Sequence, residues 1–289
     1  MRSTISTAIV LALYFVAFAE ESGDSAKADT ADTRVPAEDL VRIREACPSR
    51  PAVEPKAKRR VLIYSKWRTF RHDSIPWGAA ATRILGEKTG AFEPVLSSDS
   101  AMFEPESLRR FDVVIFNNNC EKGIDEPRRR EALFEFVKNG GGIVGVHSAS
   151  YDPNWPEFID LLGGCSVDHP WNSGSTVSVK VAAPDSPLVK PFGKGPFRHT
   201  DEIFTFSHFR PGRSRILLSL DKEGTDMTVP GVRAEAEPFP LSWIHRYGKG
   251  RVFYCAFGHQ KEVFWDSAVL EYYLRGIQYA AGDLDAEGE

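Results

Sequence analysis

The sequence predicts an α/β fold built on a mostly parallel sheet, and the order of its apolar segments carries that prediction. Short apolar runs that suit buried strands stand at residues 61–64, 113–116 and 143–146. Helical patterns separate them, at residues 75–90 and 126–139. Strands that alternate with helices are typical of βαβ units, in which the strands run parallel. We therefore expect a doubly wound sheet with residues 143–146 as its central strand.

Four further segments complete this part of the fold. Residues 38–46 fit a short helix that Pro48 ends. Residues 92–96 fit an edge strand, because a proline within them cannot donate to a central ladder. Residues 251–257 have the composition of a last buried strand, and residues 263–281 have the period of an amphipathic helix.

The pattern of apolar and polar residues changes after residue 164. Four segments there alternate apolar and polar side chains, at residues 177–181, 202–206, 216–220 and 241–245. A period of two is typical of half-buried strands. We expect these segments to form β-rich additions to the sheet.

The first residues have the features of a secretory signal peptide. Residues 8–19 form an uninterrupted apolar run after Arg2, and they end in the small-x-small pattern of a cleavage site. The run is shorter than the ~20 residues that span a bilayer. We expect a signal peptide at residues 1–19, a flexible, proline-rich linker at 20–59 and one domain at 60–285. A secreted or periplasmic protein follows.

The net charge and the spacing of the cysteines argue against several kinds of partner and site. The formal net charge of −4 leaves no basic surplus for nucleic acid. The four cysteines contain no C-x-x-C pair, so they support neither a zinc–thiolate site nor a thioredoxin-type redox centre. One disulfide, and whether the chain forms a homo-oligomer, stay open.

Two histidines follow strands that should end at the same edge of the sheet. His147 ends the central strand and His259 follows the last one. Ligands of open α/β sheets collect at the carboxyl ends of the strands. His72, in the loop after the first strand, opens onto the same edge, whereas His169 needs a long loop to reach it. Glu202, at the start of a strand, can supply a carboxylate.

Imidazoles and a carboxylate in one crevice suit two kinds of chemistry. The spacing of these residues in the sequence does not show which of the two applies. They can act as general acid and base near neutral pH. They can also ligate a divalent metal such as zinc, although no His-Glu-x-x-His pattern is present. Each histidine taken alone equally fits a turn or the core. Trp171, Trp155 and Trp67 fit either sugar-stacking platforms or core aromatics.

Several dispersed motifs stand in a fixed order between residues 60 and 285. They are Phe70-Arg71-His72-Asp73-Ser74-Ile75-Pro76, Gly140-Gly141-Gly142-Ile143-Val144-Gly145-Val146-His147-Ser148-Ala149, Asp168-His169-Pro170-Trp171, Asp201-Glu202-Ile203-Phe204, and Tyr247-Gly248-Lys249-Gly250-Arg251-Val252-Phe253-Tyr254 with Gly258-His259. In this set and order the chain resembles the ThuA-like, or trehalose-utilisation, domain family of the class I glutamine amidotransferase-like superfamily. Relatives usually carry tyrosine at the position of Phe204, so a hydroxyl role is in doubt there.

The resemblance implies a three-layer, flavodoxin-like fold and a place in disaccharide or keto-sugar catabolism. Together with the strand-end positions it indicates three groups of site residues. The catalytic set is His147, Glu202 and His259; the substrate-binding set is His72, His169, Trp171 and Asn117; the metal candidates are His147, His169 and His259.

The resemblance also implies a lost activity. Glutamine amidotransferases place a nucleophilic cysteine on the turn after the central strand, in a G-x-C-x-G pattern. The matching run here is Gly145-Val146-His147-Ser148-Ala149. Without a thiol the glutamyl thioester cannot form, so we expect no glutaminase activity.

Three hypotheses of function remain. The first is an exported enzyme, of hydrolase or lyase type, that acts on a glycoside or keto-sugar. The second is a non-catalytic sugar-binding protein on the same fold. The third is a metal-free hydrolase with Ser148 as nucleophile, which needs a histidine within hydrogen-bond reach of that hydroxyl. Convergence of three imidazoles with a carboxylate would favour the first.

Overall fold

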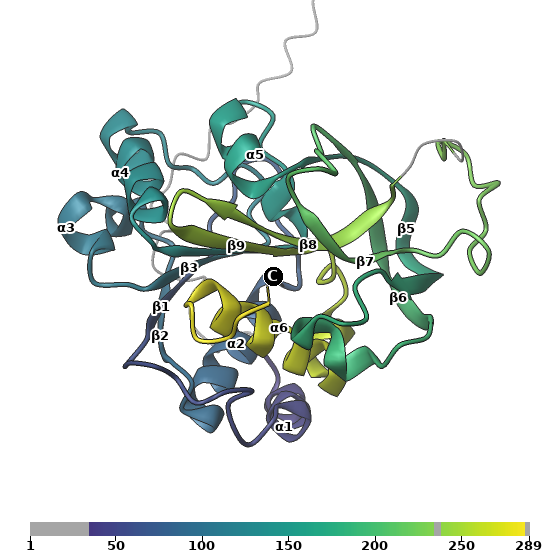
Figure 1. Ribbon diagram of the computed structural model, residues 1–289, viewed down its shortest axis with the longest axis horizontal. Helices are drawn as coiled ribbons and strands as arrows, with labels where there is room; N and C mark the ends of the chain where they lie inside the picture. The colour runs from purple at the N-terminus through teal and green to yellow at the C-terminus, as the bar shows by residue number, and fades with distance from the viewer. Residues whose placement is uncertain (1–34, 234–237, 287–289) are drawn as a thin grey trace, which may run out of the picture.

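The computed structural model describes residues 35–233 and 238–286, which form a mixed α/β fold around one nine-stranded sheet (Figure 1). The strand order is β2-β1-β3-β4-β9-β8-β7-β5-β6. Its first half is parallel throughout. The parallel strands are β2 (Glu93–Ser97), β1 (Arg60–Tyr64), β3 (Val113–Asn117), β4 (Gly142–Val146) and β9 (Gly250–Cys255). The central strand and the edge strand expected from the sequence thus take their expected places.

The other half of the sheet is antiparallel. It continues from β9 through β8 (Pro240–Tyr247), β7 (Arg215–Leu220), β5 (Cys165–Val181) and β6 (Phe197–Ser207). These are the β-rich additions that the alternating segments predict. The expectation of a mostly parallel sheet is not confirmed, because four of the eight strand pairings are antiparallel. The first reversal of direction is at β8 and β9, which are joined by the tight turn at Gly248, because a short turn can connect only antiparallel neighbours.

Helices cover both faces of the parallel half (Figure 1). On one face lie α3 (Pro105–Leu108), α4 (Pro127–Lys138) and α5 (Pro156–Leu162); on the other lie α1 (Ala37–Ala46), α2 (Ile75–Thr89) and α6 (Ser267–Ala280). Successive side chains of β1 divide between two core clusters, with Val61 and Ile63 in one and Leu62 and Tyr64 in the other. Strands buried on both faces explain why the sequence shows continuous apolar runs there. The more specific flavodoxin-like arrangement stays a prediction.

Residues 35–59 pack against the domain, which differs from the flexible linker expected there. Ile43 of α1 is fully buried, and Val35 and Cys47 are nearly so. Beyond α1, the Arg59 guanidinium pairs with the buried carboxylate of Asp283 at 2.6 Å. The prolines and lysines of this stretch suggested solvent exposure, but apolar and ionic contacts to α2 and to the C-terminal end order it.

Some sequence-based expectations fall outside these residues. The signal peptide at residues 1–19 and the first part of the linker lie outside the part of the chain that the structure describes. Within the described ranges, no helix is both long and apolar enough to cross a membrane. All four cysteines are buried free thiols, so none of them forms the disulfide that the sequence left open.

Candidate functional site

The turn that carries His147 is strained. β4 ends at Val146, and His147 begins the short 3-10 helix η3 (His147–Ser150) with a φ of 48°. Side chains other than glycine rarely adopt this left-handed region, and such strain concentrates at functional sites. The turn directs a fully buried imidazole across the carboxyl end of the sheet.

The end of β9 approaches this turn closely because position 258 is glycine. Gly258 has a φ of 140°, and a Cβ there would lie 3.2 Å from Val146 and 3.4 Å from the Cβ of His147. Ser74 and Asn118 both donate to its carbonyl oxygen. Gly258 therefore lets the chain bring the next residue, His259, over the end of β4.

A carboxylate of β6 fixes the same turn from the other half of the sheet. Asp201 is fully buried and accepts the backbone N–H groups of Gly258 at 2.7 Å and Gln260 at 2.8 Å. β6 is far from β9 in the strand order, so these contacts require the antiparallel half to curl back over the end of the parallel half. Irregular pairing between β5 and β6, with three shifts of register, accompanies that curvature.

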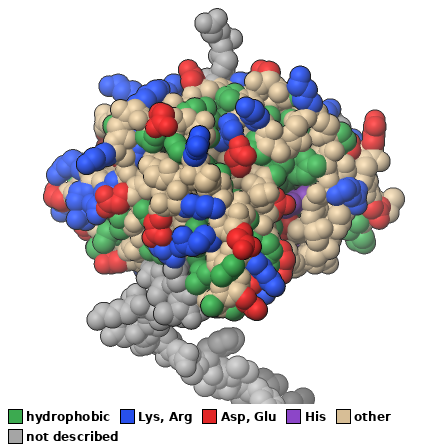
Figure 2. Space-filling model, turned by 90° about the horizontal axis from the view of Figure 1, so that it is seen from below, with side chains coloured by type: hydrophobic (Ala, Val, Ile, Leu, Met, Phe, Trp, Pro, Cys, Tyr) green, Lys and Arg blue, Asp and Glu red, His purple; other side chains and the backbone are tan. Residues whose placement is uncertain are grey.

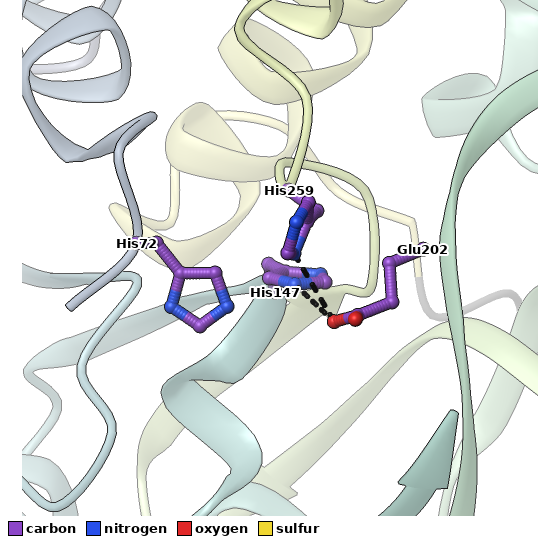
Figure 3. Close-up of side chains that lie close together, drawn as sticks. All are labelled: His72, His147, Glu202 and His259. Carbon is purple, nitrogen blue, oxygen red and sulfur yellow. Dashed lines mark ion pairs between the residues drawn. The ribbon is translucent and has the colours of Figure 1, made fainter. Parts of the chain in front are cut away.

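Alternation along β6 then places Glu202 on the opposite side from Asp201. Asp201 shares a face with His199, whereas Glu202 shares one with Phe204, whose ring stacks on His147 with centroids 4.4 Å apart. Glu202 Oε2 lies 3.3 Å from His147 Nε2 and 3.1 Å from His259 Nδ1 (Figure 3).

Four ligand-type side chains converge at this point. One donor atom from each of His72, His147, Glu202 and His259 lies within 4.8 Å of the others (Figure 3). The His72 ring stands edge-on to the rings of His147 and His259, with centroids 5.0 and 5.1 Å away. Three imidazoles and a carboxylate in one group are a donor set that suits a divalent cation such as Zn²⁺.

The hydrogen bonds of His147 fix which of its nitrogens carries a proton. Nδ1 lies 2.6 Å from the carbonyl oxygen of Ala256, which can only accept, so Nδ1 is the donor. In the neutral ring Nε2 then presents a lone pair to the site. Metal-ligating histidines are commonly oriented by this kind of bond from the other ring nitrogen. His147 Nε2 and His259 Nδ1 are both buried, and both lie beside the same oxygen, Oε2 of Glu202.

The negative charge of Glu202 and the positive charge of the neighbouring imidazoles stabilise each other. Burial by itself would raise the pKa of Glu202, but the hydrogen bonds and charges of His147 and His259 outweigh it and hold that pKa well below its usual range. Burial would lower the pKa of His259, yet Glu202 raises it above its ordinary value. Burial, with His147 and His259 adding to it, lowers the pKa of His72 to about 2. Glu202 is therefore an anion that two imidazoles face, and His72 is neutral.

His72 also meets the condition that the third hypothesis requires. Its Nδ1 lies 3.3 Å from the hydroxyl oxygen of Ser148. A base whose pKa is about 2 takes up a proton poorly near neutral pH, so this pair is weak support for a serine nucleophile. Cys120 is the thiol beside the same ring, at 3.9 Å, and burial raises its pKa.

Two of the sequence-predicted residues take different places from those expected. His169 Nδ1 lies 3.4 Å from Glu202 Oε1 on a side chain that is 57% exposed, at the edge of the cluster rather than among its four members. His72, expected to bind substrate, is a member instead. The long β5 explains this, because it carries His169 along the rim while the loop after β1 brings His72 inward.

Trp171 and Asn117, both expected to bind substrate, are not members of the cluster. Trp171 is buried in the core and donates from Nε1 to the carbonyl oxygen of Asp226. The Asn117 amide donates to Ser65 and to the carbonyl oxygen of Ile75, so it ties β3 to the first strand and helix. Both side chains have structural partners that the sequence alone does not reveal.

Asp201 is the residue whose role sequence reasoning missed, although its place beside Glu202 was the signal. We expect Asp201→Ala to lower the free energy of unfolding by roughly 3–5 kcal/mol, because buried N–H donors at the β9 turn lose their charged acceptor. Urea denaturation measures this. Ser173→Ala is the control, since Ser173 bonds the exposed side chain of Gln260 in the same turn and should cost little. Equal stability of the two variants would contradict the account of this turn.

A cavity of about 440 Å³ opens beside the cluster. His72, Ser148, His169 and Glu202 contribute to its wall, with Phe70, Tyr151, Val167 and Phe204 among the apolar residues. On the face shown in Figure 2, a histidine surface is visible in a hollow next to acidic side chains, and lysines and arginines are mixed with carboxylates elsewhere. A small molecule can therefore reach the cluster from solvent.

The chain is similar to known proteins over most of its length. Residues 60–280 match the model of the ThuA family, which is described as trehalose utilisation. A ThuA-like protein of Bacteroides uniformis has a similar fold, with a TM-score of 0.63 and 23% identity, covering 81% of this chain and 93% of that one. One from Parabacteroides merdae has a TM-score of 0.53 and 19% identity, with the same coverage. No curated protein matches the chain.

Proposed function

The chain belongs to the ThuA family, and from that premise we propose that it is an enzyme that acts on a glycoside or keto-sugar with the help of a divalent cation. The observation that carries the proposal is the convergence of His72, His147, Glu202 and His259 within 4.8 Å. The family's description, trehalose utilisation, supports a carbohydrate as the substrate. The proposal includes export through the signal expected at residues 1–19.

Each side chain has a proposed part. His147, His259, Glu202 and His72 would hold the cation, which would supply Lewis-acid polarisation of a substrate oxygen. His169 stands at the cavity side of Glu202, 3.4 Å from Oε1, where it can exchange a proton with a bound sugar. Phe204 keeps the His147 ring in place by stacking on it.

Glutamine hydrolysis is not part of this function. The turn after β4 carries an imidazole, and the cysteine beside it, Cys120, keeps its proton because burial raises its pKa. A thiol is a much weaker nucleophile than a thiolate. These features support the expectation that no glutamyl thioester forms.

The proposal predicts that His147→Ala abolishes turnover. Turnover of a keto-glycoside, measured by the release of the reducing sugar, should fall by about 10²–10⁴-fold. His147 is fully buried and bonds Ala256, so we also expect a loss of roughly 1–3 kcal/mol of stability, and the assay is run well below the unfolding temperature.

His208→Ala is the control for this experiment, since His208 is exposed outside the cluster. It should leave turnover unchanged. Full activity of the His147→Ala protein would rule out the proposed role of the cluster. Tight sugar binding without any turnover by the wild-type protein would favour the non-catalytic sugar-binding alternative.

A further inference from the structure

Exposed apolar side chains gather at one place on the described part of the molecule. Among the described residues, four large apolar side chains are exposed: Val41 at 54%, Phe70 at 56%, Tyr151 at 36% and Val167 at 57%. Three of the four line the cavity beside the cluster, and Val41 lies apart on α1. Exposed apolar residues that converge on one cavity mark a binding site, whereas scattered ones are ordinary.

The three residues come from separate segments. Phe70 lies in the loop after β1, Tyr151 follows η3, and Val167 lies on β5. The Phe70 ring stands 4.8 Å from the His72 ring, so the apolar rim begins directly beside the cluster. A cavity of about 440 Å³ falls within the usual range for small-molecule sites.

The charge of the cavity wall restricts the ligand further. Among the described residues that line it, the charged side chains are the carboxylates Asp168 and Glu202, with no lysine or arginine. Phosphate groups are bound by arginine, lysine or the N-termini of helices. The neighbouring cavity on the other side of His72 differs, since Arg71 and Lys261 line it. With Glu202 assigned to the proposed cation, Asp168 is the other charged side chain of the first cavity's wall, and no cationic side chain among its described residues is there to bind a phosphate. The first cavity thus suits an uncharged ligand with an apolar face.

We propose that this cavity binds a sugar ring of an unphosphorylated glycoside, with the C–H face of the ring against Phe70, Tyr151 and Val167. The inference rests on the proposed function, and it assigns the residues that determine its substrate class. Pyranose rings present axial C–H groups on one face and hydroxyls at the edge. In this orientation the hydroxyl edge meets Asp168 and His169, while the glycosidic end points to Glu202.

Isothermal titration calorimetry with trehalose and with trehalose 6-phosphate tests the inference. Phe70→Ala should weaken trehalose binding by about tenfold, because an aromatic contact is lost. Val167→Ala should weaken it by a few-fold. Val41→Ala is the matched control, an equally exposed valine away from the cavity, and should change nothing. Trehalose 6-phosphate should bind the wild-type protein at least about tenfold more weakly than trehalose.

Several results would overturn the inference. They are the absence of trehalose binding, unchanged binding by Phe70→Ala and Val167→Ala, and binding of the phosphorylated sugar as tight as that of trehalose. A change of sedimentation coefficient in Phe70→Ala, with sugar binding intact, would show instead that the rim joins copies of the chain.

The inference and the proposed function can fail separately. If the cavity variants bind trehalose normally while His147→Ala abolishes turnover, the sugar does not bind at Phe70 and Val167, and the proposed enzymatic function is retained. If Phe70→Ala weakens trehalose binding but the wild-type protein turns over no substrate, the sugar site at Phe70 is retained and the proposed enzymatic function is wrong.

Discussion

Replacing Glu202 with glutamine should remove the proposed cation and the proposed activity together. We expect zinc in the purified protein to fall from about one ion per chain to background, because Glu202 Oε2 is the anionic ligand that faces both His147 and His259. Turnover should fall by about 10²–10⁴-fold. Glutamine has nearly the same shape, so the circular dichroism spectrum should be unchanged. Metal analysis and the keto-glycoside assay measure both effects.

Glu157→Gln is the matched control. Glu157 is exposed on α5, and the same substitution there should leave zinc content and turnover at wild-type levels. A Glu202→Gln protein that keeps its zinc would remove Glu202 from the ligand set. One that loses zinc but keeps its activity would separate the cation from the chemistry and contradict the proposed function.

Removal of the metal is the second change with a large expected effect. Dialysis against a chelator should abolish turnover, and stoichiometric Zn²⁺ should restore it. His147 Nε2 and Glu202 Oε2 lie 3.3 Å apart, so both atoms can bind one cation at this point. Zinc at a hundred times its Kd should add about 2.7 kcal/mol to the free energy of unfolding.

The His147→Ala protein is the control for this titration. Zinc should not stabilise it, because one of the ligands is gone. Equal stabilisation of both proteins would indicate binding at another place, and activity that survives complete removal of metal would favour acid–base chemistry by the same side chains.

Local patterns predicted the parallel half of the fold well, since each strand there is buried on both faces. Residues 61–64 and 113–116 fall within β1 and β3, and residues 143–146 within β4. The antiparallel half was harder. β5 runs over 17 residues from Cys165, but its first part carries polar residues such as Asp168 and Asn172, which hide the period of a strand.

The sequence predicted those positions of the site that depend on the order of the strands alone. His147 and His259 follow neighbouring parallel strands, so their convergence follows from strand-end geometry. Glu202 reaches them only because the sheet curls back, which depends on the bulges between β5 and β6. The burial of Trp171 and the structural bonds of Asn117 depend on tertiary partners, and no local pattern records them.

Anomalous diffraction at the zinc absorption edge, from crystals of the metal-loaded protein, tests the central claim most directly. The account predicts one strong peak enclosed by His72, His147, Glu202 and His259, with His147 bound through Nε2 and Glu202 through a carboxylate oxygen. A fully loaded crystal with no peak at that position, or with its zinc held by other residues, would contradict it.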